Sequence, residues 1–184
     1  MEKVFLSSSG PSSVTIEQKP FSFLRAATLL PSPAIKSFTA IATPVQRTLK
    51  AKCIVDNKSV GKIDNGLMLL VGFTEGDSSK EIDWMVNKVL NLRIFDDENG
   101  VMNKSVLDVG GEILSISQFS LYADPTKGNR PSYIKALNGD KAIDLYNEFN
   151  DKLGKRIKVE TGIFGADMKI DFINDGPITI ILEK

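Results

Sequence analysis

The sequence contains no histidine among its 184 residues and only one cysteine, Cys53. Without an imidazole, the chain cannot form a Ser-His-Asp or Cys-His catalytic unit, a histidine general base, or a zinc site with histidine ligands. A single cysteine cannot close an internal disulfide or supply an all-thiolate metal cage. The remaining metal ligands are carboxylates and carbonyls, which disfavour a tight transition-metal site but leave room for loosely bound magnesium or calcium.

The sequence also lacks an excess of either charge and a long apolar run. It has 23 basic and 23 acidic side chains, which give a formal net charge of zero. Broad binding to nucleic acid needs many phosphate-neutralising cations, so this balance argues against a DNA-binding surface but not against contact with a short piece of RNA. No stretch approaches the roughly 20 consecutive apolar residues of a membrane span. Length and composition are those of one globular domain with a real core.

Residues 1–43 differ in composition from the rest of the chain. They contain eight Ser, four Thr and four Pro, with four basic side chains against two acidic ones. The prolines interrupt any long helix, so we expect this N-terminal extension to be disordered and the folded domain to comprise residues 44–184. A Ser-rich, acid-poor segment resembles an organellar transit peptide, and the alternative is an untargeted tail or a misassigned start.

Alternating apolar residues from Val45 to Val55 predict a half-buried strand, and Pro44 is expected to shorten its start. Arg47 falls on the apolar face of this strand, where it either forms a buried ion pair or belongs to a functional site. Turn sequences after this strand predict two or three antiparallel strands, which end in the buried run 67–71.

Two amphipathic helices are expected further along the domain. Ser78 and Glu81 form a capping-box pattern before the first helix, and Gly154 stops the second. Strands are expected at 113–122, 157–159, 168–173 and 178–182. This order of elements predicts an α+β fold in which antiparallel sheets form a partly rolled, barrel-like core with two amphipathic helices.

Two short runs stand out as candidates for chemistry. The first is Ser117-Gln118-Phe119-Ser120-Leu121-Tyr122, which places polar residues in an apolar strand. The second is Asn174-Asp175-Gly176-Pro177-Ile178-Thr179, whose first four residues by themselves predict a hairpin turn.

Together these runs resemble the two signature motifs of the D-aminoacyl-tRNA deacylases, the D-Tyr-tRNA deacylase family. Other segments match this family in the same order, and the similarity covers 45–184, or 140 of 184 residues. Position 120 is Ser where the family usually has Thr, which keeps the hydroxyl. The other matching segments are Val45-Gln46-Arg47, Asn91-Leu92-Arg93-Ile94-Phe95, Lys127-Gly128-Asn129-Arg130-Pro131-Ser132 and Gly162-Ile163-Phe164-Gly165-Ala166-Asp167-Met168.

The resemblance implies a homodimer that acts on the 3′ end of aminoacyl-tRNA, without a cofactor or metal. Such enzymes hydrolyse the ester of a D-amino acid, or of glycine mischarged on tRNA-Ala, and reject L-amino acids. The Gly-Pro pair, here Gly176-Pro177, is cis in these proteins and reaches into the partner's pocket. The family is cytoplasmic, whereas a transit peptide would direct this chain to a plastid or mitochondrion.

The resemblance also assigns roles to individual residues. By the resemblance, the Phe119 and Ser120 backbone amides would stabilise the oxyanion, whereas the Ser120 hydroxyl is a candidate catalytic group by its own chemistry. Arg47 would hold the Gly-Pro loop. The implied substrate-binding residues are Ser117, Gln118, Phe119, Phe164, Gly165, Ala166, Met168, Asn174, Gly176, Pro177 and Arg47.

The absence of histidine bears on the mechanism, because a Ser120 nucleophile would need a base. The family resemblance implies instead that the 2′-OH of the terminal ribose assists the reaction. Two alternatives stay open: a non-catalytic dimeric module that binds an aminoacyl-adenosine or nucleotide end, and a serine esterase of small molecules.

Overall fold

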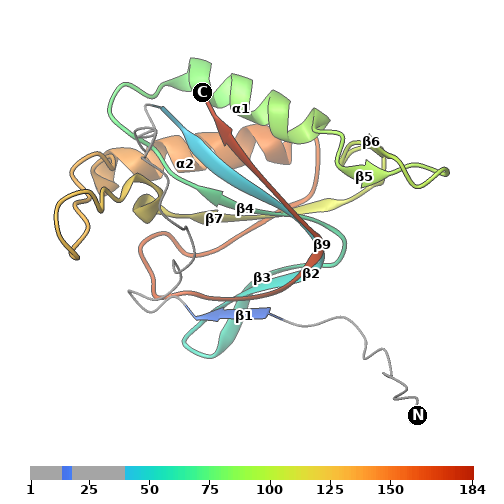
Figure 1. Ribbon diagram of the computed structural model, residues 1–184, viewed down its shortest axis with the longest axis horizontal. Coiled ribbons are helices and arrows are strands. Elements are labelled where there is room, and N and C mark those ends of the chain that lie inside the picture. Colours follow the sequence, from blue (N-terminus) through green and yellow to red (C-terminus); the bar gives the residue numbers. More distant parts are fainter. Residues whose placement is uncertain (1–13, 18–39) are drawn as a thin grey trace, which may run out of the picture.

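A seven-stranded mixed sheet forms the framework of the protein (Figure 1), whose structure is a computed structural model that describes residues 14–17 and 40–184. The strand order is β1-β9-β2-β4-β7-β8, and β3 pairs with β2. A separate hairpin, β5–β6, projects beside helix α1. The elements are β1 Val14–Glu17, β2 Ala42–Val55, β3 Lys58–Ile63, β4 Gly66–Val71, α1 Ser79–Asn91, β5 Phe95–Asp96, β6 Met102–Lys104, β7 Glu112–Ser117, the 3₁₀ helix η1 Phe119–Tyr122, α2 Gly139–Gly154, β8 Val159–Thr161 and β9 Lys169–Glu183.

The expected α+β class with two amphipathic helices is confirmed, and the sheet curls into a nearly closed barrel. The sheet is mixed rather than wholly antiparallel, because β4 pairs parallel to β7 and β7 parallel to β8. The segment between β4 and β7 contains α1 and the β5–β6 hairpin, and α2 lies between β7 and β8. Connections of this length allow the chain to return and start the next strand in the same direction.

Strand β4 separates two hydrophobic cores. Leu67 and Leu69 face the first core, where both helices pack against one side of the sheet. Met68 faces the second core, inside the curled sheet, where Cys53 is fully buried. A strand covered on both faces explains why the sequence here is a continuous apolar run rather than an alternating one. Cys53 is thus a packing residue.

Helix α1 begins where the capping-box pattern predicts, and helix α2 ends at Gly154 as expected. The capping box is present, since the Ser78 backbone N–H donates to Glu81 Oε2 at 3.1 Å and the Ser78 side chain caps the first turn. The buried face of α2 includes Tyr146 and Phe149. Neither helix in the described part of the chain has the length and apolar character to cross a bilayer.

The start of the domain differs from the expectation in one respect. Strand β2 begins at Ala42 and runs through Pro44, opposite Ile181 of β9, so Pro44 does not shorten the strand. Proline fits here because its fixed φ suits extended backbone and the missing N–H falls near a strand end. Within the predicted extension the structure describes β1, which pairs antiparallel with β9. Residues 1–13 and 18–39 lie outside the described residues, so their disorder stays a prediction.

Three expected strands have different boundaries in the structure. The strand predicted at 113–122 ends at Ser117, and the chain turns into η1. The two strands predicted on either side of residues 174–177 are one strand, β9. The hairpin-turn interpretation of these four residues is therefore wrong, because the chain keeps its direction and both halves of β9 pair with β2. The register shifts where β2 passes Thr48, which makes this point a bulge.

Candidate active site

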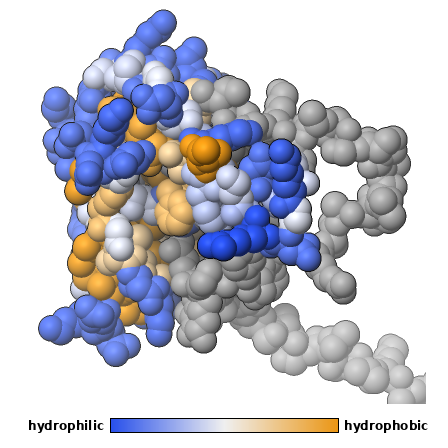
Figure 2. Space-filling view, turned by 90° about the vertical axis from the view of Figure 1, so that its left-hand side faces the viewer, coloured by the Kyte–Doolittle hydropathy of each residue, from blue (hydrophilic) through white to orange (hydrophobic). Residues whose placement is uncertain are grey.

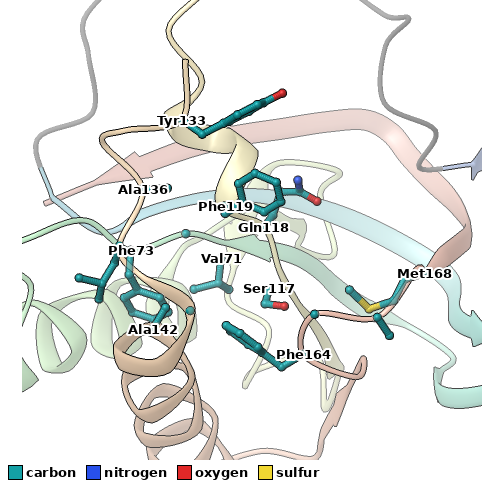
Figure 3. Close-up of a pocket in the computed structure, with 15 residues that line it drawn as sticks. Val71, Phe73, Ser117, Gln118, Phe119, Tyr133, Ala136, Ala142, Phe164 and Met168 are labelled. Carbon is teal, nitrogen blue, oxygen red and sulfur yellow. The ribbon is translucent and has the colours of Figure 1, made fainter. Parts of the chain in front are cut away.

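A cavity of about 420 Å³ opens between the end of β7, the N-terminus of α2 and the loop before β9 (Figure 3). Its size is typical of a pocket for one small ligand. Its walls come from segments that are far apart in the sequence. The lining residues are Val71, Gly72, Phe73, Ser117, Gln118, Phe119, Tyr133, Ala136, Leu137, Gly139, Ala142, Phe164, Gly165, Ala166 and Met168.

The turn after β7 builds one wall. The Gln118 backbone N–H donates to Val71 O at 2.7 Å, which holds the end of β7 against β4. The chain then enters η1, whose N-cap is Gln118. The N–H groups in the first turn of a 3₁₀ helix have no acceptor within the helix, so the amides of Phe119 and Ser120 are potential donors to a bound group.

The loop at 162–168 builds the opposite wall. The Phe164 ring packs against Tyr146 with 5.8 Å between centroids, and the Tyr146 hydroxyl donates to Ser115 O at 2.7 Å. Gly162 packs so closely on Met168 that an added side chain would collide with the Met168 sulfur. The wall is therefore fixed to α2 and β7 at both ends, which presents an aromatic ring and a thioether to the cavity.

Among the residues that the structure describes, the cavity wall contains no group suited to act as a general base near neutral pH. None of its lining residues in the described chain is acidic or basic, and its titratable side chain is Tyr133. Burial raises the pKa of the nearby Tyr146 hydroxyl, and it also raises the pKa of the Cys53 thiol. Both groups therefore stay protonated, and neither can supply a phenolate or thiolate.

The Ser120 hydroxyl lies beside the cavity and accepts a hydrogen bond from a side-chain amide. The Gln118 side-chain N–H donates to Ser120 Oγ. An amide donor stabilises the oxygen but does not remove its proton, so this arrangement differs from a serine paired with a base.

The structure brings together most of the residues that the sequence assigned to the substrate. Ser117 and Phe119 from one motif share the cavity with residues of the other wall, and Figure 3 shows Ser117 and Phe164 facing the same space. The predicted residues that line it are Ser117, Gln118, Phe119, Phe164, Gly165, Ala166 and Met168. Sequence reasoning missed Tyr133, although it directly follows the Lys127–Ser132 motif, and the apolar wall from β4 and α2, which carried no signal beyond core packing.

The Gly-Pro pair and Arg47 lie elsewhere. Gly176 and Pro177 are exposed, their peptide bond is cis as the resemblance implies, and neither lines the cavity of its own chain. Asn174, just before them on β9, donates from Nδ2 to Thr179 Oγ1 at 3.3 Å. Four of the residues assigned to substrate, Arg47, Asn174, Gly176 and Pro177, are thus outside the cavity.

Arg47 is 8% exposed and ties this part of β9 to the β5–β6 hairpin. Its Nε lies 2.7 Å from Asp175 Oδ2, the residue before Gly176, and its NH1 lies 3.4 Å from Asp96 Oδ1. NH1 also donates to Ile94 O at 2.8 Å. Arg47 is therefore a buried cation that pairs with Asp175, directly before the Gly-Pro pair, and its role as a site residue stays a prediction. The β5–β6 hairpin lies on the side of the molecule away from the loop at 123–138 (Figure 1).

Within the described residues, no group of three or more Asp, Glu or Cys side chains is arranged to hold a metal ion.

The chain is similar in sequence to several known proteins. A sequence-family profile described as D-Tyr-tRNA(Tyr) deacylase matches residues 44–183. Proteins named D-aminoacyl-tRNA deacylase from Parabacteroides distasonis, Clostridium acetobutylicum and Flavobacterium psychrophilum are 50%, 51% and 52% identical to this chain. The matches cover 77%, 76% and 76% of this chain and 96%, 95% and 95% of the relatives.

Two solved structures are also similar. One, described as c-Myc DNA Unwinding Element Binding Protein, is 39% identical with a TM-score of 0.74, over 78% of this chain and 98% of that one. The other, described as a probable eukaryotic D-amino acid tRNA deacylase, is 20% identical with a TM-score of 0.67, over 79% of this chain and all of that one. The second likeness concerns the fold alone.

Proposed function

Because the chain belongs to the D-Tyr-tRNA(Tyr) deacylase family and is thus a deacylase enzyme, we propose that it hydrolyses D-aminoacyl-tRNA. The bond that breaks is the ester between the amino acid and the 3′-terminal adenosine, and the products are the free amino acid and tRNA. The observation that carries this proposal is the cavity, which joins the Ser117–Phe119 segment to the Phe164–Met168 segment. One wall offers polar groups for an ester, and the other offers an aromatic ring and a thioether for a nucleobase.

The proposed mechanism uses a hydroxyl of the substrate. A water molecule adds to the ester carbonyl, the bond to the ribose 3′ oxygen breaks, and this oxygen takes up a proton as the tRNA leaves. The neighbouring 2′-OH assists the proton transfers, since the described residues of the cavity wall include no carboxylate or lysine and the chain has no histidine. The amides of Phe119 and Ser120 stabilise the oxyanion that forms on the carbonyl oxygen.

Rejection of L-amino acids is proposed to come from main chain rather than side chain. In this proposal the protein is a homodimer, and the carbonyls of Gly176 and Pro177 from one subunit face the chiral centre of the substrate in the other. Their exposure and their separation from the cavity of their own chain support this arrangement. Glycine has no side chain to reject, so the same pocket would also release glycine mischarged on tRNA-Ala.

A deacylation assay tests this function directly. Purified protein is mixed with tRNA that carries D-tyrosine, L-tyrosine or glycine, and the ester that survives is measured with time. We expect release of D-tyrosine and glycine, while the L-tyrosyl ester decays at the rate of the buffer control. Release of L-tyrosine at the D rate would contradict chiral selection, and an intact D-tyrosyl ester would contradict the enzyme.

Two alternatives give different results in the same assay. A non-catalytic module that holds an aminoacyl-adenosine end would bind the D-aminoacyl-tRNA and leave it intact. A serine esterase of small molecules would also cleave an ester on a 2′-deoxy terminal ribose, whereas the substrate-assisted mechanism predicts that this substrate is stable.

A further inference from the structure

Two aromatic rings at the mouth of the cavity are exposed. The Phe119 side chain is 60% exposed and Tyr133 is 38% exposed, and their rings meet edge to face with centroids 5.1 Å apart. In Figure 3, Phe119 lies between Tyr133 and Ser117, and the Tyr133 hydroxyl points away from the cavity. Both rings line the cavity, so they form its rim rather than a separate patch.

The loop that leads to Tyr133 is basic. Asp124 and Ser132 close it with two backbone hydrogen bonds of 2.8 and 2.9 Å, and Lys127 and Arg130 lie exposed between them. Residues 124–135 contain three basic side chains and one acidic one, in a chain whose net charge is zero. Figure 2 shows this face, where apolar surface is flanked by hydrophilic side chains.

We infer that Phe119 and Tyr133 form a stacking platform for the nucleobase that precedes the terminal nucleoside of a single-stranded RNA 3′ end. This inference rests on the proposed function, which places that terminal nucleoside in the cavity. A cavity of about 420 Å³ is filled by one aminoacylated nucleoside, so the next nucleotide leaves through the mouth, where the two rings lie. Aromatic side chains stack any base, because every base has a π-face.

RNA fits this rim better than a second copy of the chain. Single-stranded nucleic acids bind to exposed aromatic rings beside a cationic loop, because the rings stack on the bases and the cations contact the phosphates. Lys127 and Arg130 are placed to meet the phosphates on either side of the stacked base. A second copy carries the same basic loop, so two copies meeting at this rim would bring like charges together.

The experiment compares two non-hydrolysable ligands. The first is 3′-amino-3′-deoxyadenosine with D-tyrosine in amide linkage, and the second is the same group at the end of a single-stranded trinucleotide. We expect Tyr133→Ala to weaken binding of the trinucleotide about 5- to 100-fold more than it weakens binding of the nucleoside ligand, since loss of one stacked base has an effect of this size. Tyr133→Phe keeps the ring and is the matched control, expected to bind both ligands like the wild type.

A second measurement addresses the loop. The double variant Lys127→Ala/Arg130→Ala should reduce the salt dependence of trinucleotide binding, with a slope of log K against log salt that is smaller by about 0.7 per lost phosphate contact. Binding of the nucleoside ligand should keep its slope. Sedimentation tests whether Tyr133→Ala and the double variant have the same oligomeric state as the wild type.

The outcomes separate this inference from the proposed function. If the wild type deacylates D-tyrosyl-tRNA but binds both ligands equally, the stacking platform is wrong and the enzyme assignment stands. The stacking platform would also be wrong if Tyr133→Ala weakened the binding of both ligands equally. A change in oligomeric state would overturn it as well, and would indicate that the rim is a protein contact. A wild type that neither deacylates nor binds either ligand would overturn both.

Discussion

The hydroxyl of Ser120 is the group in the signature motif that the sequence analysis named as a candidate catalytic group. Serine oxygen attacks an ester only when a base takes its proton, and the chain has no histidine to do so. The Ser120 oxygen instead accepts a hydrogen bond from the Gln118 amide. We therefore assign this hydroxyl to positioning of the turn at the start of η1, where the backbone amides lie.

Replacement of Ser120 by alanine tests this assignment. We expect Ser120→Ala to keep most of the deacylation of D-tyrosyl-tRNA, because the backbone amide remains and the substrate supplies its own 2′-OH. The measurement is the first-order rate constant of deacylation under single-turnover conditions, with Phe164→Ala as a variant that should be impaired through loss of the ring in the cavity wall. A loss of about 10³-fold for Ser120→Ala would identify the hydroxyl as an essential catalytic group.

At the scale of elements, the bulge in β9 depends on a charged contact with β2. Asp175 stands directly before Gly176 and pairs with Arg47, whose side chain is 10% exposed. Arg47 also reaches Asp96 and Ile94 O, so the position of the Gly-Pro loop is coupled to the β5–β6 hairpin. Removing one partner of such a buried cation leaves a charge that is poorly compensated.

The variant Asp175→Asn keeps the size of the side chain and removes its charge. A fully buried pair would lose about 3–5 kcal/mol, but Asp175 is about one-third exposed, so we expect the free energy of unfolding to fall by about 1–2 kcal/mol. The displaced loop should lower kcat/KM for D-tyrosyl-tRNA by about 10- to 100-fold.

Asp171→Asn is the matched control for this variant. Asp171 lies on the same strand, pairs with Lys52 of β2 at 3.0 Å and is similarly exposed, but it does not adjoin Gly176. We expect it to change stability by less than about 1 kcal/mol and to leave kcat/KM unchanged. Equal losses of activity in the two variants would mean that general stability, and not the loop, is responsible.

The same elements show how much of the fold can be predicted from the sequence. The spacing of apolar residues predicted both helices and strands β2 to β4. An element that buries one face repeats its apolar residues at a fixed period, and a strand that is buried on both faces is a continuous apolar run. The end of β7 at Ser117 was missed, since apolar residues continue into η1 and the turn depends on the bond from Gln118 to Val71 O. The bulge at Gly176 was interpreted as a hairpin, because the local turn residues are the same and only the pairing of both halves of β9 with β2 distinguishes them.

At the scale of the whole molecule, the two parts of the expected site, the cavity and the Gly-Pro pair, lie apart within a single chain. The cavity lies between η1, α2 and the loop at 162–168, whereas Gly176 and Pro177 lie beside the β5–β6 hairpin. The sequence motifs assigned both parts to one substrate, and the resemblance to the family implies that the two parts meet between subunits rather than within a chain. The separation favours assembly of each site from two subunits.

A complementation experiment decides between these arrangements. Phe164→Ala damages the cavity, and Gly176→Ala damages the loop, because Gly176 has a φ of +114° and an added Cβ would lie 2.7 Å from Ile178 Cγ1. Chains with the two substitutions are co-expressed with different affinity tags, and the heterodimer is purified through both tags. Gly110→Ala, at φ +61° with no atom within 4 Å of its added Cβ, controls for backbone strain and should keep full activity.

Each homodimeric variant should be inactive, and the heterodimer should recover about half of the activity of the wild-type dimer. One of its sites combines the intact cavity of the Gly176→Ala subunit with the intact loop of the Phe164→Ala subunit, while the other site contains both defects. If the loop served the cavity of its own chain, each subunit would contain one defect and the heterodimer would be inactive. Recovery of D-tyrosyl-tRNA deacylation in the mixed dimer would therefore require the Gly-Pro loop of one subunit to act on the substrate of the other.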